Sequence, residues 1–157
     1  MKQFALTAFF SLALLPSQRG FAADPSYDVS KTDASLAAGG KGKASVTITA
    51  KNGWHLNAEA PLTLKLAPAP GVTVDKEKLA RADLAMSTPA SARFEVGVTS
   101  GESGKKSVQA EASFVLCQED SCRPVKEKVS FEVDVRAPAE PAVSTTTSGK
   151  HPAKKKN

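Results

Sequence analysis

Two cysteines, Cys117 and Cys122, are the residues of this sequence whose type and spacing most directly offer chemistry. Four polar residues, Gln118 to Ser121, separate them, and a strand-like apolar stretch comes before Cys117. If these four residues form a hairpin loop, the cysteines face each other across two strands, with Cβ atoms roughly 4.5–5.5 Å apart. That separation is close to disulfide geometry. The pair therefore predicts a disulfide, with either a structural or a redox role.

The short spacing of the cysteines favours a bond that opens and closes. In the loop-entropy model a ring of six residues gains on the order of 2 kcal/mol, compared with roughly 3 kcal/mol for a ring of 15 residues. A hairpin already closed by its own backbone ladder should gain less than that. A redox role for Cys117 and Cys122 is therefore our main hypothesis. The alternative is an inert structural disulfide.

The rest of the chain predicts the strands that would position this pair. Four segments alternate apolar and polar residues with period two, as strands with one buried face do. Their apolar faces run over Ala44–Ala50, Phe94–Val98, Val108–Leu116 and Val129–Val135. Shorter candidate strands are Tyr27–Val29, Trp54–Leu56, Leu62–Leu66 and Val72–Val74.

These short strands, joined by Gly- and Pro-containing turns, predict an all-β, immunoglobulin-like sandwich of two sheets in a single domain. The exception is Asp75–Ala85, whose residues favour helix, and we expect a helical turn or an ordered loop there. Trp54 is the one tryptophan, and we expect it to anchor the core.

The two ends of the chain differ in composition from the middle. Residues 1–23 combine an early lysine, a short apolar run and small residues, which predicts a signal peptide and export to the periplasm or the extracellular space. We expect the folded domain over residues 24–136, with no transmembrane segment once the signal is removed. Residues 137–157 are rich in Pro, Ser, Thr and Lys and predict a disordered basic tail.

The net charge of +5 comes from these two ends. Six of the 21 basic residues and one of the 16 acidic residues lie there, so the central part is formally neutral. Nucleic-acid binding is therefore not expected. The lysines of the tail could contact an anionic surface weakly, although a solvated tail is the simpler interpretation.

Other kinds of site have less support in the sequence. A metal site could be imagined from Cys117, Cys122, His55 and Met86, but only the two cysteines are close in sequence, and structural zinc normally takes four ligands. The sequence shows no phosphate-binding glycine loop and no hydrolase motif. We therefore expect neither a metal nor a cofactor.

Three segments carry a resemblance to a known family. They are Lys43–Ala50, the following Lys51–Asn57 with its Gly-Trp-His-Leu-Asn run, and Phe114–Pro124 with the cysteine pair. Over roughly Tyr27–Arg136 the sequence resembles the amino-terminal periplasmic domain of DsbD and small DsbD-alpha-like proteins. Of these features, the cysteine pair late in an immunoglobulin-like chain is the more specific.

The resemblance implies a thiol-disulfide interchange module. Such a domain accepts reducing equivalents from a thioredoxin-like partner and passes them to the disulfides of periplasmic proteins, as part of a protein-disulfide reductase system. By position, Cys122 would form the mixed disulfides and Cys117 would resolve them. Here the membrane carrier and thioredoxin-like domain of DsbD are absent, so we expect any electron donor to be a separate protein.

The sequence departs from the family at the loop that caps the cysteines. The family carries an aromatic residue in this loop, whereas the corresponding segment here, Asp83–Met86, has none. The candidates for covering the disulfide are Leu84 and Met86. The loop between the cysteines is also one residue shorter than in the family. These departures leave open the alternative of a non-catalytic β-sandwich, with a binding or structural role and an inert disulfide.

Overall fold

A computed structural model describes residues 26–137 of the chain. The predicted signal peptide, residues 1–23, lies outside the described residues, and so does the predicted tail apart from Ala137. Among residues 26–137, no helix has the length and apolar character needed to cross a membrane.

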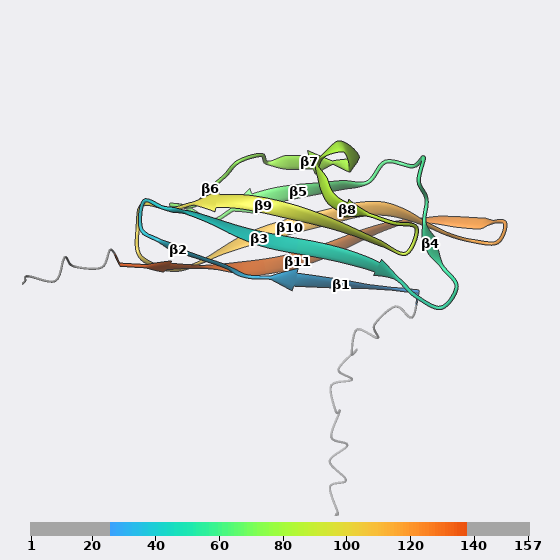
Figure 1. Ribbon diagram of the computed structural model, residues 1–157, viewed down its shortest axis with the longest axis horizontal. Coiled ribbons are helices and arrows are strands. Elements are labelled where there is room, and N and C mark those ends of the chain that lie inside the picture. The colour runs from blue at the N-terminus through green and yellow to red at the C-terminus, as the bar shows by residue number, and fades with distance from the viewer. Residues whose placement is uncertain (1–25, 138–157) are drawn as a thin grey trace, which may run out of the picture.

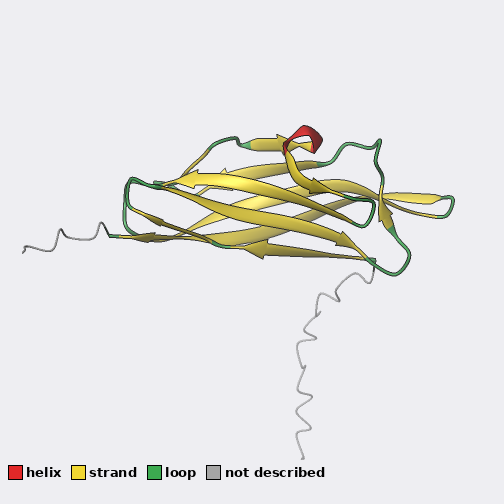
Figure 2. Ribbon diagram, in the orientation of Figure 1, coloured by secondary structure: helices red, strands yellow, loops and turns green. Residues whose placement is uncertain are grey.

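The described chain is built from short and long strands with one turn of 3₁₀ helix (Figures 1 and 2). In chain order the elements are β1 (Tyr27–Thr32), β2 (Ala34–Ala37), β3 (Lys41–Ala50), β4 (His55–Leu56), β5 (Thr63–Pro68), β6 (Thr73–Val74), β7 (Lys78–Ala80), η1 (Arg81–Asp83), β8 (Leu84–Ser87), β9 (Ser91–Thr99), β10 (Gly104–Gln118) and β11 (Ser121–Arg136).

The strands form two sheets. The first sheet has the order β1-β3-β9-β6, with β8 also paired to β9. The second has the order β2-β11-β10-β5-β7, with β4 also paired to β10. All of these pairings are antiparallel except that of β2 with β11. The prediction of an immunoglobulin-like sandwich of two sheets is confirmed.

The core lies between the sheets, where alternate residues of each strand point inward. In β3 the sequence Ala-Ser-Val-Thr-Ile-Thr-Ala places every second residue in the core, as the period-two pattern predicts. The largest buried side chains are Phe94 of the first sheet with Phe114 and Phe131 of the second. Burying one such side chain fully stabilises the fold by roughly 1.5–3 kcal/mol.

One expectation about local structure is confirmed in part and another is wrong. The helical turn expected within Asp75–Ala85 is the 3₁₀ turn Arg81–Asp83, but Lys78–Ala80 is a strand, because it pairs with β5. Pairing at the edge of the sheet overrides the helix propensity of this segment. Trp54 does not anchor the core: it is half-buried and packs at the margin of the core, which the three phenylalanines fill instead.

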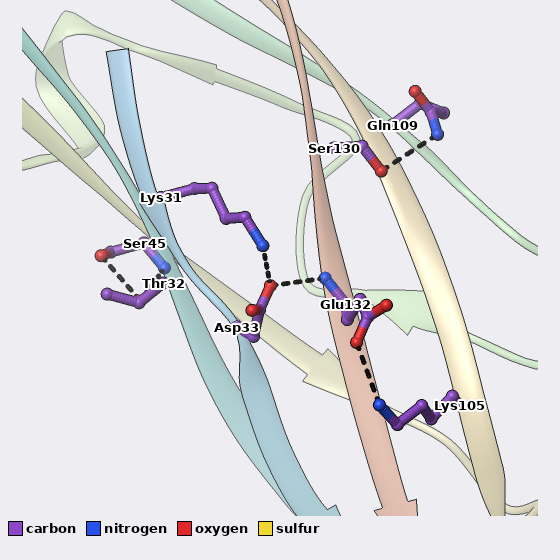
Figure 3. A network of polar contacts seen from close by, with 8 residues as sticks. All are labelled: Lys31, Thr32, Asp33, Ser45, Lys105, Gln109, Ser130 and Glu132. Atoms are coloured by element: carbon purple, nitrogen blue, oxygen red, sulfur yellow. Dashed lines mark hydrogen bonds and ion pairs between the residues drawn. The ribbon is translucent and has the colours of Figure 1, made fainter. Parts of the chain in front are cut away.

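The chain passes from the first sheet to the second between β1 and β2, at Asp33. Figure 3 shows this crossing: Asp33 Oδ1 accepts hydrogen bonds from Lys31 Nζ at 2.5 Å and from the backbone N–H of Glu132 at 2.7 Å. The hydrogen bond from Lys31, helped by the one from Glu132, lowers the pKa of the Asp33 carboxyl. This carboxylate therefore links β1 to β11 at the point where the chain passes from the first sheet to the second.

Candidate redox site

The two cysteines lie near the tip of the long hairpin formed by β10 and β11. The ladder pairs residues from Gly104 opposite Val135 up to Gln118 opposite Ser121. The turn is therefore shorter than the four-residue loop expected from the sequence, since only Glu119 and Asp120 lie outside the strands. Glu119 adopts a left-handed backbone conformation, with φ of 52°. Figure 1 shows the tip extending beyond the other strands.

Cys117 and Cys122 are directly opposite each other and form a disulfide. Their Cα atoms are 4.1 Å apart and their sulfur atoms 1.98 Å apart. The short Cα separation is typical of the non-hydrogen-bonded positions of an antiparallel pair, where opposite Cα atoms are about 4.5 Å apart. The predicted disulfide is thus confirmed.

The two halves of the disulfide differ in accessibility. Phe114 and Leu116 point into the core, so Cys117, the next residue along β10, lies on the outward face of the second sheet. Cys117 is nevertheless buried, with 4 % of its surface exposed. Cys122, on the outer side of the same row, is exposed. An incoming protein therefore has access to the disulfide from the Cys122 side.

Strand β4 pairs with β10 on the side of Cys117 that is away from Cys122. His55 pairs with Cys117, and the next residue of β4 pairs with Leu116. The order of strands β11, β10 and β4 therefore places Cys122, Cys117 and His55 in one row on the outward face. Asn57, just after β4, donates a hydrogen bond from Nδ2 to Cys117 Sγ at 3.4 Å.

Asn57 is held in this position by several hydrogen bonds. Its backbone N–H donates to the carbonyl oxygen of Val115 at 3.0 Å, and its Oδ1 accepts from the backbone N–H groups of Glu59 and Ala60 at 2.8 and 2.9 Å. Arg81, from the 3₁₀ turn, donates to the carbonyl oxygens of Asn57 and Ala60 at 2.6 and 2.8 Å. The amide that touches Cys117 is therefore fixed by contacts on both its backbone and its side chain.

The inward side of the hairpin end is held by the loop before β4. The guanidinium of Arg123 lies over the ring of Trp54, 5.0 Å from its centroid, and donates a hydrogen bond to Ser26 Oγ. Gln118 Nε2 donates to the carbonyl oxygen of Asn52 at 3.3 Å. A cation–π contact contributes roughly 0.5–1 kcal/mol at an exposed site and about 2 kcal/mol when desolvated, and both partners here are half-buried. These contacts attach the hairpin end to the sandwich on the face opposite the disulfide.

The cap-loop candidates lie in β8, in the first sheet. Leu84 is opposite Phe94 and half-buried against the core, while Met86 is opposite Arg93 and exposed. The residues immediately after β8 approach the strand that covers Cys117, because the N–H of Leu56 in β4 donates to the carbonyl oxygen of Pro89 at 2.7 Å. Covering of the disulfide by Leu84 or Met86 stays a prediction.

A groove of about 480 Å³ opens next to β4, and neither cysteine is among its lining residues. His55, Asn57 and Arg81 line one part of it, and the segment Ser87–Pro89 lines another. Asn57 connects this groove to the disulfide, because its Nδ2 also donates a hydrogen bond to Cys117 Sγ.

The arrangement of these residues was only partly predictable. In the residues that the structure describes, no three His, Cys, Asp or Glu side chains gather as metal ligands, and the two cysteines bond to each other. The sequence offers His55 only as a distant metal ligand, and Asn57 only as part of the Gly-Trp-His-Leu-Asn run. Their position beside Cys117 depends on the pairing of β4 with β10, which the sequence pattern does not show.

Comparison with known proteins gives no assignment of family. No family model matches the chain, and no curated protein matches it. The solved structures with similar folds include AggA, the major subunit of aggregative adherence fimbriae type I from Escherichia coli (TM-score 0.38, 8% identity, covering 69% of this chain and 93% of that chain). They also include a conjugative transposon lipoprotein from Bacteroides eggerthii (TM-score 0.37, 8% identity, covering 69% of this chain and 98% of that chain). A third is a PapD-like domain of human CEP192 (TM-score 0.36, 12% identity, covering 83% of this chain and 98% of that chain).

These similarities are too low to bear on function. The description of the fold rests on the strand pairing given above. The resemblance to the DsbD amino-terminal domain stays a prediction.

Proposed function

We propose that this protein is an exported thiol-disulfide exchange module, which passes reducing equivalents between a thioredoxin-like partner and exported proteins through Cys117 and Cys122. The observation that carries the proposal is the unequal accessibility of the two cysteines, with Cys122 exposed and Cys117 buried. Exchange proceeds by attack of a thiolate on one sulfur of a disulfide, and access decides which sulfur is attacked.

The exchange step follows from this geometry. A partner thiolate attacks Cys122 Sγ, a new sulfur–sulfur bond forms to the partner, and the Cys117–Cys122 bond breaks. The bonding electron pair leaves with Cys117 Sγ. The second thiol of the partner then attacks the mixed disulfide and releases Cys122 as a thiolate, so the partner is oxidised and this protein reduced. The same steps in reverse reduce the disulfide of an acceptor protein.

The position of the pair also supports exchange over a purely structural role. The ladder continues past the cysteines to Gln118 opposite Ser121, so the backbone already closes the hairpin beyond the disulfide. Opening the bond leaves that pairing in place. The fold therefore has little need of the disulfide, which is what a bond that cycles between two states requires.

Export is part of the same proposal. A disulfide persists in oxidising compartments such as the periplasm, and is rare where glutathione and thioredoxin keep thiols reduced. The predicted signal sequence in residues 1–23 agrees with that setting. We propose that the chain works in the periplasm or outside the cell.

A trapping experiment tests the proposal. The Cys117→Ser variant keeps the exposed Cys122 but cannot resolve a mixed disulfide, so it should accumulate covalent complexes with a thioredoxin-like protein. Extracts of the exported fraction, separated on non-reducing gels and identified by mass spectrometry, provide the measurement. The matched control is Cys122→Ser, whose remaining cysteine is buried and should trap far less. No complexes from Cys117→Ser, or equal trapping by both variants, would refute the proposal.

The second candidate is a binding or structural β-sandwich with an inert disulfide. The observation in its favour is the close fixing of Cys117, which is buried and contacted by Asn57 Nδ2. In this case the disulfide would serve to hold β10 and β11 together where β4 pairs with the hairpin. A double Cys117→Ser, Cys122→Ser variant would then keep its partner binding, and neither single variant would trap a redox partner.

A further inference from the structure

His55 lies opposite the cysteine whose sulfur must leave when the disulfide opens. It is paired with Cys117 in the register of β4 with β10, and it lines the groove next to β4. Opposite residues on one face of an antiparallel pair have Cβ atoms roughly 4.5–5.5 Å apart. The imidazole therefore lies on the side of Cys117 that is away from Cys122, where an attacking partner does not approach.

Opening the disulfide creates a negative charge on Cys117 Sγ, and the burial of Cys117 makes this charge unfavourable. Attack on the exposed Cys122 leaves the electron pair on Cys117 Sγ, whose residue is 4 % exposed. Burial disfavours a thiolate, because the charged form loses its hydration. The hydrogen bond from Asn57 Nδ2 offsets part of this cost, since a donor that touches the sulfur favours its charged form. A proton delivered to the sulfur would remove the charge altogether.

We propose that His55 exchanges this proton with Cys117 during thiol-disulfide exchange, an inference that rests on the proposed function of the pair. As the partner thiolate bonds to Cys122 Sγ, the protonated imidazole of His55 gives its proton to Cys117 Sγ. The products are a Cys117 thiol, a neutral imidazole and the mixed disulfide on Cys122. In the resolving direction the neutral imidazole takes the proton from the Cys117 thiol, which attacks Cys122 Sγ and releases the partner thiolate.

The groups around His55 are compatible with this role. Histidine is the side chain that ordinarily changes charge between pH 5 and 8, so it can both give and take a proton there. The charged residue that shares the groove lining is Arg81, whose guanidinium donates hydrogen bonds to the carbonyl oxygens of Asn57 and Ala60. The segment Ser87–Pro89, which also lines the groove, is uncharged, and so are Leu116 and Gln118, the neighbours of Cys117 on β10.

The test is the pH dependence of disulfide reduction by a small thiol. The purified oxidised protein is reduced with dithiothreitol between pH 5 and 9, and each rate is divided by the concentration of dithiothreitol thiolate. In the wild type this normalised rate should fall as pH rises, because the protonated imidazole is lost. In His55→Gln it should be flat and, at pH 6, lower by about tenfold, below the ~10²–10⁴ typical of general acid catalysis.

Two controls separate proton transfer from an effect on folding. Adding imidazole to His55→Ala should restore much of the rate, since the groove of about 480 Å³ next to β4 leaves room for it. Lys128→Gln removes a positive charge from an exposed position of β11, six residues and roughly 20 Å along the strand from Cys122, and should behave as the wild type. Thermal unfolding of each variant checks that the fold is kept.

The outcome distinguishes this inference from the proposed function. A His55→Gln profile that matches the wild type, or a slow His55→Ala that imidazole does not rescue, would overturn the role of His55 even if Cys117→Ser traps partners. A His55-dependent profile in a protein that traps no partner would support the proton transfer and refute the exchange function. The small-thiol assay needs no natural partner, so either result is decisive.

Discussion

Reduction of the disulfide should lower the free energy of unfolding only slightly, because the disulfide closes a short ring in a hairpin that is already paired. The ring closed by Cys117 and Cys122 contains six residues. Loop entropy gives on the order of 2 kcal/mol for such a ring. This value is an upper bound here, because Gln118 and Ser121 remain paired when the bond is open. We therefore expect the free energy of unfolding to fall by no more than about 2 kcal/mol on reduction.

The same number bounds the effect on the redox couple. By a thermodynamic cycle, the loss of stability on reduction equals the shift in reduction potential that folding imposes on the disulfide. A difference of 30 mV corresponds to about 1.4 kcal/mol for this two-electron couple, so 2 kcal/mol corresponds to on the order of 40 mV. The fold should therefore leave the couple close to the potential of an unconstrained disulfide with the same spacing.

The assays are urea denaturation and thermal unfolding of the oxidised and the dithiothreitol-reduced protein, both followed by circular dichroism. The reduced protein should unfold in one cooperative transition in each, with a melting temperature in the thermal scan lower by about 10 °C at most. The Cys117→Ala, Cys122→Ala variant, measured with and without dithiothreitol, controls for effects of the reagent. A reduced protein that is unfolded at 25 °C, or a decrease in the free energy of unfolding above about 4 kcal/mol, would show that the fold depends on the disulfide and would favour a structural role.

Two further predictions concern contacts that position the site and the sheets. Replacing Arg81 with Ala removes the hydrogen bonds to the carbonyl oxygens of Asn57 and Ala60, which should lower the free energy of unfolding by about 1–3 kcal/mol in urea denaturation. The same change at exposed Arg93 should lower it by less than about 0.5 kcal/mol. Equal losses in the two variants would contradict the role given to Arg81. Because its pKa is lowered by the hydrogen bond from Lys31, the Asp33 carboxylate contributes stability above its unfolded pKa, and this contribution is lost as pH falls through the lower folded-state value. Asp33→Asn should therefore flatten the decline of unfolding free energy below about pH 4, and an unchanged pH dependence would contradict this.

The predictable part of the fold came from strands with one buried face. The alternation in β3, β9, β10 and β11 reports burial on one side of a sheet, and this signal is local to each strand. Strands β2 and β7 have no such signal, because they are short and are defined by the strand that they pair with. The helical turn expected within Asp75–Ala85 is present at Arg81–Asp83, but the strand β7 just before it was not expected, since local propensity does not show pairing with a neighbouring strand.

The candidate site was predictable at its cysteines and not beyond them. Cys117 and Cys122 are close in sequence, so a hairpin alone brings them together. His55 and Asn57 are about 60 residues away, and only the pairing of β4 with β10 places them beside Cys117. The difference in exposure between the two cysteines also depends on β4, and no periodicity in the sequence reports it.

The reduction potential of the Cys117–Cys122 couple decides between thiol-disulfide exchange and a structural disulfide. The purified protein is equilibrated in glutathione or dithiothreitol buffers of known potential, and its free thiols are counted by mass tagging. For an exchange module we expect a value in the range of exchange proteins, roughly −120 to −270 mV. A value below about −300 mV would contradict it, because a disulfide that resists the glutathione pool to that extent is structural.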